Sequence, residues 1–273
     1  MTGGRIPGRM RKPCGLSFLF FRPADECGNF MILAPSRNLE RRNLQPEIMD
    51  QPGLDAERYR RVMEGLARIN YLTRSASIVW PSIWQVAAES PGHPLTLLDV
   101  ATGAGDLPVA LWRRARRAGI DLRISACDIS DLAIEHARRR ARRAGANIDF
   151  FVRDAVAPGF ADQYDVVTSS LFLHHLDELR CIEALRRMSA SARRLLLIND
   201  LLRSRASYWM AYLGVRLLTR SEVMHIDGPR SVEGAFTLDE IRQLCLQAGL
   251  EAAELQRRWP CRYLLRWRRR GLA

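Results

Sequence analysis

Lysine is almost absent from this chain, because Lys12 is the only one among 42 basic side chains and the rest are arginine. No run of about 18 apolar residues is present, which argues against a membrane-spanning helix. The six cysteines form no C-x-x-C pair, so their spacing indicates neither a zinc site nor a thioredoxin-type motif. We therefore expect a reduced, cytoplasmic chain with no transmembrane segment and no metal site.

The chain does contain enough apolar material for a large core. It has 273 residues, of which 47% are hydrophobic and 26% charged, as in soluble globular proteins. The net charge of +12 would ordinarily suggest a nucleic-acid or membrane partner. However, arginines concentrate in residues 112–143 and 257–270, and a skew toward arginine is typical of GC-rich coding. We therefore expect a solvated basic surface and no nucleic-acid partner.

Short apolar runs alternate with helical periodicities from residue 95 onward. The runs suited to buried strands cover residues 95–101, 122–127, 148–152, 164–169 and 194–198. This alternation is typical of β-α-β units and predicts an α/β fold with a doubly wound, mostly parallel sheet. We divide the chain into a poorly ordered basic leader (1–48), a helical N-terminal extension (49–94) and a sheet domain (95–273).

The sharpest feature is a glycine-containing turn, Thr102-Gly103-Ala104-Gly105-Asp106, between the first strand and the next helix. Glycines at such a turn let the backbone approach a ligand closely. No lysine follows them, which excludes a P-loop, and Pro108 stands where a dinucleotide-binding loop has its third glycine. Asp99 and Asp106 would repel a phosphate and attract a cation. The turn therefore predicts a small, phosphate-free and partly cationic ligand.

Two further aspartates end the next two strands. Asp128 lies 23 residues beyond Gly105, close to the offset of about 20 residues at which a strand-end carboxylate accepts hydrogen bonds from ribose hydroxyls. Asp154 ends the third strand, where we expect contact with an adenine amino group. Singly, each aspartate is equally well explained as a helix cap or turn residue. Together they fit S-adenosylmethionine, which has a ribose diol, an ammonium and a sulfonium but no phosphate.

Four segments in this order resemble the successive motifs of the class I S-adenosylmethionine-dependent methyltransferases: LLDVATGAGDLPVAL (97–111), ISACDIS (124–130), FFVRDA (150–155) and YDVVTSSLFLHHLD (164–177). The resemblance implies a Rossmann-like, seven-stranded sheet with an antiparallel last hairpin, and S-adenosylmethionine as cofactor. It also implies that residues 95–273 bind this cofactor and that the extension is similar to the N-terminal lid of quinone-biosynthesis methyltransferases. The implied cofactor-binding residues are Asp99, Ala101, Gly103, Gly105, Asp106, Asp128, Ile129, Asp154, Ala155, Ser170 and Leu171.

Three histidines are candidate bases, since a phenolic acceptor with a pKa near 10 would benefit from a neutral imidazole. His174 and His175 follow the fourth strand, and the competing explanation is that they only pack around the cofactor. His225 lies in residues 221–237, which we expect to be an irregular connector acting as a lid or a plain surface loop. Thr237 opens a capping box, T-L-D-E.

Three more residues are candidates for binding the acceptor. Arg230 in the same connector would hold a carboxylate or phenolate. Trp209 and Tyr212, at helical spacing, would line an apolar acceptor pocket or face the core.

We therefore predict a methyltransferase acting on a small apolar acceptor of phenolic or polyketide-derived kind, as in secondary metabolism, with transfer to oxygen. Transfer to carbon of a quinone-like ring is the nearest alternative. A nicotinamide-dependent oxidoreductase on the same sheet is the rival enzyme class, and Asp106 and Pro108 count against it. A nucleic-acid-binding protein is the third hypothesis, based on the arginine-rich stretches at 138–143 and 266–270. The sequence leaves the oligomeric state open.

Overall fold

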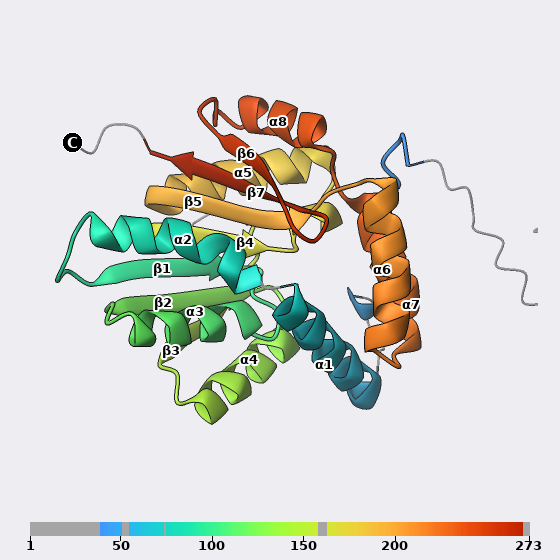
Figure 1. Ribbon diagram of the computed structural model, residues 1–273, viewed down its shortest axis with the longest axis horizontal. Helices are drawn as coiled ribbons and strands as arrows, with labels where there is room; N and C mark the ends of the chain where they lie inside the picture. The colour runs from blue at the N-terminus through green and yellow to red at the C-terminus, as the bar shows by residue number, and fades with distance from the viewer. Residues whose placement is uncertain (1–38, 51–54, 74, 158–162, 270–273) are drawn as a thin grey trace, which may run out of the picture. The chain divides into compact units, whose positions relative to one another are not determined.

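A computed structural model describes residues 39–50, 55–73, 75–157 and 163–269 (Figure 1). Most of the expected leader, residues 1–38, lies outside the described residues. The expected division at residues 48 and 94 and the cytoplasmic location stay predictions. Within the described ranges, no helix has the length and apolar character that crossing a bilayer requires.

One seven-stranded sheet organises the chain in the strand order β3-β2-β1-β4-β5-β7-β6. The strands are β1 (Leu95–Val100), β2 (Leu122–Asp128), β3 (Ile148–Val152), β4 (Tyr164–Ser170), β5 (Ala192–Leu201), β6 (Glu254–Arg258) and β7 (Arg262–Arg268). Strands β1 to β5 run parallel, β7 is antiparallel to β5, and β6 and β7 form the closing hairpin. The predicted α/β fold, its mostly parallel sheet and the antiparallel last hairpin are confirmed.

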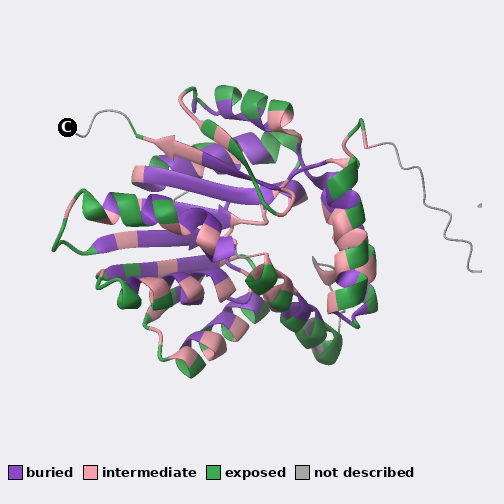
Figure 2. Cartoon of the chain, in the orientation of Figure 1, coloured by how far each residue is buried: buried purple, intermediate pink, exposed green. Residues whose placement is uncertain are grey.

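Helices cover both faces of this sheet (Figures 1 and 2). One face carries α2 (Ser75–Ala88), α3 (Asp106–Arg117) and α4 (Asp131–Ala144), and the other carries α5 (Glu178–Ser191) and α8 (Leu238–Gln247). Leu97 and Leu98, neighbours in β1, are fully buried in the two opposite cores. Because both of its faces are covered, β1 is a nearly continuous apolar run rather than an alternating one.

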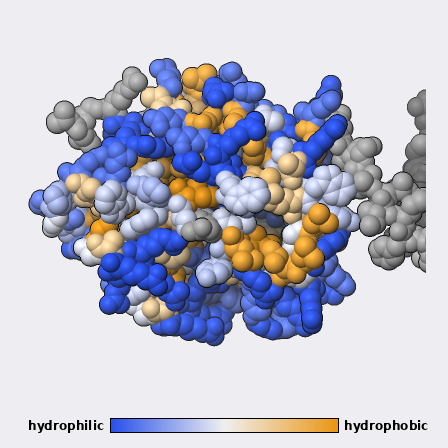
Figure 3. Space-filling model, viewed as in Figure 1, coloured by the Kyte–Doolittle hydropathy of each residue, from blue (hydrophilic) through white to orange (hydrophobic). Residues whose placement is uncertain are grey.

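Three more helices lie beyond the carboxyl ends of the parallel strands: α1 (Ala56–Leu72), α6 (Arg205–Leu218) and α7 (Glu222–Gly234) (Figure 1). They contact one another, and Figure 3 shows apolar side chains gathered on the α6 side of the molecule. Since β1 pairs with both β2 and β4, the order of connections reverses beside it. Ligands of doubly wound sheets bind at such a switch point, outside the carboxyl ends, which here means beneath these three helices.

The expectation of an irregular connector over residues 221–237 is wrong, because most of it forms α7. Gly228 and Pro229 suggested a break, yet both lie inside the helix. A Cβ at Gly228 would lie 2.7 Å from Val215 Cγ1, so glycine permits close packing against α6. Pro229 is buried, and tertiary packing outweighs its low helix propensity. The predicted capping box at Thr237 is confirmed at the start of α8.

Candidate active site

A cavity of about 1170 Å³ lies between the carboxyl ends of the strands and helices α1, α6 and α7. Its sheet side is lined by polar groups at the ends of β1, β2 and β3 and by the glycine turn. Its helix side is mostly apolar, with Met63, Leu66, Met210, Val215 and Met224 among the lining residues, and Ser207, Asp227 and Ser231 also line it. The cavity therefore has a polar part and an apolar part that meet beneath α1.

The structure brings the predicted cofactor-binding residues to this cavity, with the exception of Gly105. Gly103 has a φ of 54° and open space where a Cβ would stand, so this part of the turn is accessible to a ligand. At Gly105 the φ is 72°, and a Cβ would lie 2.8 Å from Ala137 Cβ. Gly105 thus allows α3 and α4 to pack closely, and Gly103 is the glycine that faces the cavity.

Asp99 is buried next to the glycine turn and is hydrogen-bonded to its first residue, Thr102. Its carboxylate accepts hydrogen bonds from the hydroxyls of Thr102 at 2.7 Å and Thr168 at 2.8 Å. Burial raises the pKa of Asp99 to about 7 despite these two hydrogen bonds.

Asp128 ends β2 opposite the turn and accepts hydrogen bonds from the backbone N–H groups of Gly103 at 2.8 Å and Ser130 at 3.0 Å. The neighbouring Ile129 is 65% exposed and lines the cavity. Asp128 is therefore held in one orientation at the cavity wall, as a carboxylate that receives ribose hydroxyls must be.

The ends of β3 and β4 complete the polar part. Asp154 accepts a hydrogen bond from the Val156 N–H at 2.9 Å, and Ala155 beside it is buried. Ser170 accepts a hydrogen bond from the Asn199 side chain at 2.8 Å. Two non-glycine residues at this edge, Ala101 and Leu171, have positive φ values of 56° and 58°. Such backbone strain concentrates at functional sites in proteins.

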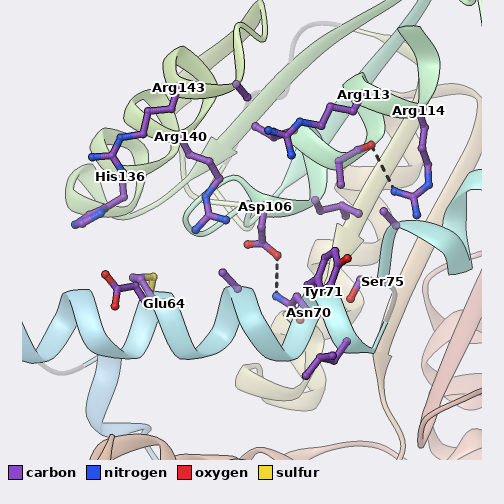
Figure 4. Close-up of a pocket in the computed structure, with 18 of the residues that line it drawn as sticks. Glu64, Asn70, Tyr71, Ser75, Asp106, Arg113, Arg114, His136, Arg140 and Arg143 are labelled. Atoms are coloured by element: carbon purple, nitrogen blue, oxygen red, sulfur yellow. Dashed lines mark hydrogen bonds between the residues drawn. The ribbon is translucent and has the colours of Figure 1, made fainter. Parts of the chain in front are cut away.

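A charged corner closes the cavity where α1 meets the glycine turn (Figure 4). Asn70 donates a hydrogen bond to Asp106 at 2.9 Å and accepts one from Arg262 at 3.4 Å. Arg262 also donates to the hydroxyls of Ser75 at 2.6 Å and Thr73 at 2.7 Å. Its guanidinium is fully buried, and no carboxylate of the described residues forms an ion pair with it. Burial lowers the pKa of Arg262 to about 10.

A second cavity of about 1320 Å³ adjoins this corner, and Asn70, Ser75 and Asp106 line both. Arg113, Arg140 and His136 lie on its walls (Figure 4). These arginines belong to the basic stretch that we expect to be solvated, and the absence of a nucleic-acid partner stays a prediction.

His174 and His175 line the main cavity from a short 3₁₀ helix after β4 (Leu173–His175). Nδ1 of His174 lies 2.6 Å from Oδ1 of Asp200, which is fully buried. Burial alone would raise the pKa of Asp200, but the charge of His174 and the hydrogen bonds from His174 and the Leu201 N–H hold that pKa below its ordinary value. Glu47 is buried beside both histidines, with its Oε1 3.8 Å from His174 Nε2.

The other predicted acceptor-side residues do not line the cavity. His225 Nε2 lies 2.9 Å from the Thr219 carbonyl oxygen. Asp227 accepts hydrogen bonds from the Ile48 and Met49 N–H groups. Arg230 lies 3.9 Å from Asp227. Trp209 and Tyr212 lie away from the cavity, and other residues of α6, among them Met210 and Gly214, line it.

Two cavity residues, Arg262 and Glu47, and one residue behind the cavity wall, Asp200, were missed from the sequence. Arg262 was hidden within a run of basic residues, and Glu47 lay in the stretch assigned to the leader. Asp200 carried a usable signal, because it ends the fifth buried strand as Asp99 and Asp128 end the first and second.

Comparison with known proteins gives a consistent result. Residues 97–194 match the family model described as a methyltransferase domain. Release factor glutamine methyltransferase of Mycobacterium tuberculosis is 35% identical over 82 residues, which are 30% of this chain and 26% of that protein. Ubiquinone biosynthesis O-methyltransferase of Thiobacillus denitrificans is 27% identical over 165 residues, which are 58% of this chain and 66% of that protein. The chain thus spans about a quarter of the first relative's length.

Among solved structures, the plantazolicin methyltransferase BpumL in complex with SAH superposes with a TM-score of 0.54 at 16% identity, covering 74% of each chain. At this identity the likeness shows a shared fold. The domain match over residues 97–194, the sheet order and the glycine turn after β1 confirm the predicted resemblance to the class I S-adenosylmethionine-dependent methyltransferases.

Proposed function

We propose that the protein transfers a methyl group from S-adenosylmethionine to the hydroxyl of a small, apolar acceptor of phenolic or polyketide-derived kind. The observation that carries this proposal is the division of one cavity into two parts. Carboxylates and an open glycine turn line the part at the sheet, and methionine and aliphatic side chains line the part under the helices. A nucleoside with a charged tail fits the first part, and an apolar molecule fits the second.

The residues at the polar part match the groups of the cofactor one by one. Asp128 would accept hydrogen bonds from the ribose hydroxyls, and Asp154 with Ala155 would flank the adenine. Asp106 would receive the ammonium. Arg262 would pair with the carboxylate of the cofactor. Within the described residues its hydrogen bonds go to neutral groups, and because an unpaired buried charge is costly, a ligand carboxylate would stabilise it.

When bound, S-adenosylmethionine supplies a methyl group on a sulfonium, so that a carbon–oxygen bond forms while the carbon–sulfur bond breaks and sulfur keeps the electron pair. The chain aligns the acceptor oxygen with that carbon and excludes water from the apolar part. The hydroxyl proton passes to water, and His174 and His175, which line the same cavity, would promote its loss. Transfer to a ring carbon is the alternative, and activity independent of these histidines would favour it.

Isothermal titration of the purified chain with S-adenosylmethionine, S-adenosylhomocysteine and NADH tests the cofactor. We expect heat from the first two and none from NADH, whose pyrophosphate would meet Asp106 and Asp128. Heat from NADH alone would refute the proposal. Mass spectrometry of products from a panel of phenols, with quinones lacking a free hydroxyl as controls, then separates oxygen from carbon transfer.

A further inference from the structure

Two histidines and a glutamate meet at the wall of the main cavity. Glu47, His174 and His175 each offer a ligand atom, and these atoms lie within 4.8 Å of one another. Glu47 and His174 are 6% and 5% exposed, and all three residues line the cavity. We propose that these three side chains bind one divalent transition-metal ion of the zinc type. The role of this ion in catalysis rests on the proposed function, whereas binding of the ion does not.

The hydrogen-bond pattern leaves a gap that suits a cation. Asp200 lies 2.6 Å from Nδ1 of His174 and accepts its proton, so that in a neutral, metal-binding ring Nε2 would carry the lone pair on the side of Glu47. Oε1 of Glu47 lies 3.8 Å from this Nε2 and 3.9 Å from His175 Nδ1. Both distances exceed the limit of about 3.2 Å for a direct hydrogen bond, and a cation between these atoms would attract the carboxylate and both ring nitrogens.

The spacing is close to that of a coordination shell. Two ligands that each lie about 2.1 Å from an ion at a tetrahedral angle are about 3.4 Å apart. The two measured separations, 3.8 and 3.9 Å, need side-chain shifts of a few tenths of an ångström to reach it.

Outer contacts hold two of the ligands in place, as is usual around protein metal sites. Asp200 fixes the ring orientation of His174. The hydroxyl of Ser231 donates to Glu47 Oε1 at 2.5 Å. Asp227 receives the N–H groups of Ile48 and Met49 at 2.9 and 3.1 Å, which anchors the backbone that follows Glu47. A carboxylate–histidine–metal chain and an anchored glutamate are thus already present.

The donor set also indicates which ion binds and what it does. Two imidazoles and one carboxylate suit Zn²⁺, whereas Mg²⁺ and Ca²⁺ prefer oxygen ligands. Three protein ligands leave a position open toward the cavity, as in catalytic zinc sites. An acceptor oxygen would fill it, and the ion would lower the pKa of the hydroxyl, whose proton passes to water. His174 and His175 then act as ligands and not as the bases predicted from the sequence.

The test is titration of the chelator-treated full chain with ZnCl₂, in the absence of cofactor and acceptor. We expect one ion per chain, with a dissociation constant below about 1 μM, and a raised melting temperature. Glu47→Gln should weaken binding by about 10- to 100-fold or more, as loss of a metal contact does. Glu251→Gln, on the exposed surface, is the matched control and should bind as the wild type.

A second variant guards against a folding defect in the first. His175→Asn, at a half-buried position, should also weaken Zn²⁺ binding and change the visible absorption of bound Co²⁺. Unchanged affinity in both variants would assign the ion to cysteines such as Cys261 and overturn the proposal. Binding weaker than about 1 mM would mean that water or a proton fills the gap, with the same consequence. A separate titration with S-adenosylmethionine shows whether the proposed function fails independently.

Discussion

Replacing Arg262 by glutamine tests where the amino-acid end of the cofactor lies. The guanidinium is buried, and its hydrogen-bond partners are the neutral groups of Asn70, Thr73 and Ser75. Hydrogen bonds to a charged partner contribute about 1.5 to 3 kcal/mol. Arg262→Gln should therefore weaken S-adenosylhomocysteine binding by about 10- to 150-fold.

The assay compares two ligands that differ only at the amino-acid end. Isothermal titration with 5′-methylthioadenosine, which has the nucleoside but lacks the amino and carboxylate groups, should give equal affinities for wild type and Arg262→Gln. Arg257→Gln, at an exposed position of β6, should leave both ligands unaffected. Equal losses for both ligands would mean that Arg262 supports the cavity as a whole, and no loss for either would remove it from the cofactor site.

Stability gives an independent check on the same variant. The folded state lowers the pKa of Arg262 to about 10 through burial, so the charged form is destabilised on folding. Removing the charge should leave the free energy of unfolding of the ligand-free protein unchanged or slightly higher. A large decrease in the free energy of unfolding, measured by urea denaturation, would show that the hydrogen bonds to Ser75 and Thr73 contribute more than the burial of the charge costs.

Three further predictions concern the ends of β1 and β2 and the glycine turn. Asp128→Ala should weaken S-adenosylmethionine binding by about 10- to 100-fold, roughly 1.4 to 2.8 kcal/mol, and unaltered affinity in titration would remove the ribose role. Gly105→Ala should lower the melting temperature, since the residue has a φ of 72° and its Cβ would lie 2.8 Å from Ala137 Cβ. Gly103→Ala, in open space with a φ of 54°, should lower the melting temperature less. Equal decreases for the two variants would contradict the packing role of Gly105. Asp99 has a pKa raised to about 7 in the folded state, so it binds a proton there that the unfolded chain releases near pH 4. Its contribution to stability therefore decreases as pH rises from about 4 to about 7, and Asp99→Asn should flatten this part of the wild-type profile of unfolding free energy against pH.

The parallel sheet could be predicted because its strands have a recognisable pattern, and two of them also have an aspartate at or next to the carboxyl end. Each apolar run is short and bounded by polar residues, and the aspartates Asp99 and Asp128 stand at the carboxyl ends where a ligand would be met. The turn at Gly103 was predicted for the same reason, since local sequence determines it. Whether these residues bind the cofactor stays a prediction until it is measured.

The acceptor side could not be predicted in the same way, because its residues come from helices whose relative rotation depends on tertiary packing. Trp209 and Tyr212 have the right spacing for a cavity wall, yet Met210 and Gly214 on another face of α6 line it. Residues 222–234 read as a loop because glycine and proline are poor helix formers, while the contact of Gly228 with Val215 favours the helix. Glu47 is held near the histidines by Ser231, which donates to its carboxylate, and by Asp227, which accepts from the N–H groups that follow it, and neither contact has a local signature.

Helix α1 contributes to both the polar part and the apolar part of the main cavity. Asn70 near its end bridges Asp106 and Arg262, and Gly65, more than a turn earlier, lies against Met224 of α7. A tilt of α1 that changes its contacts at the cofactor part of the cavity would therefore also change the part proposed to hold the acceptor. Binding of the cofactor is therefore expected to change the affinity for the acceptor, and binding of the acceptor the affinity for the cofactor, by the same factor.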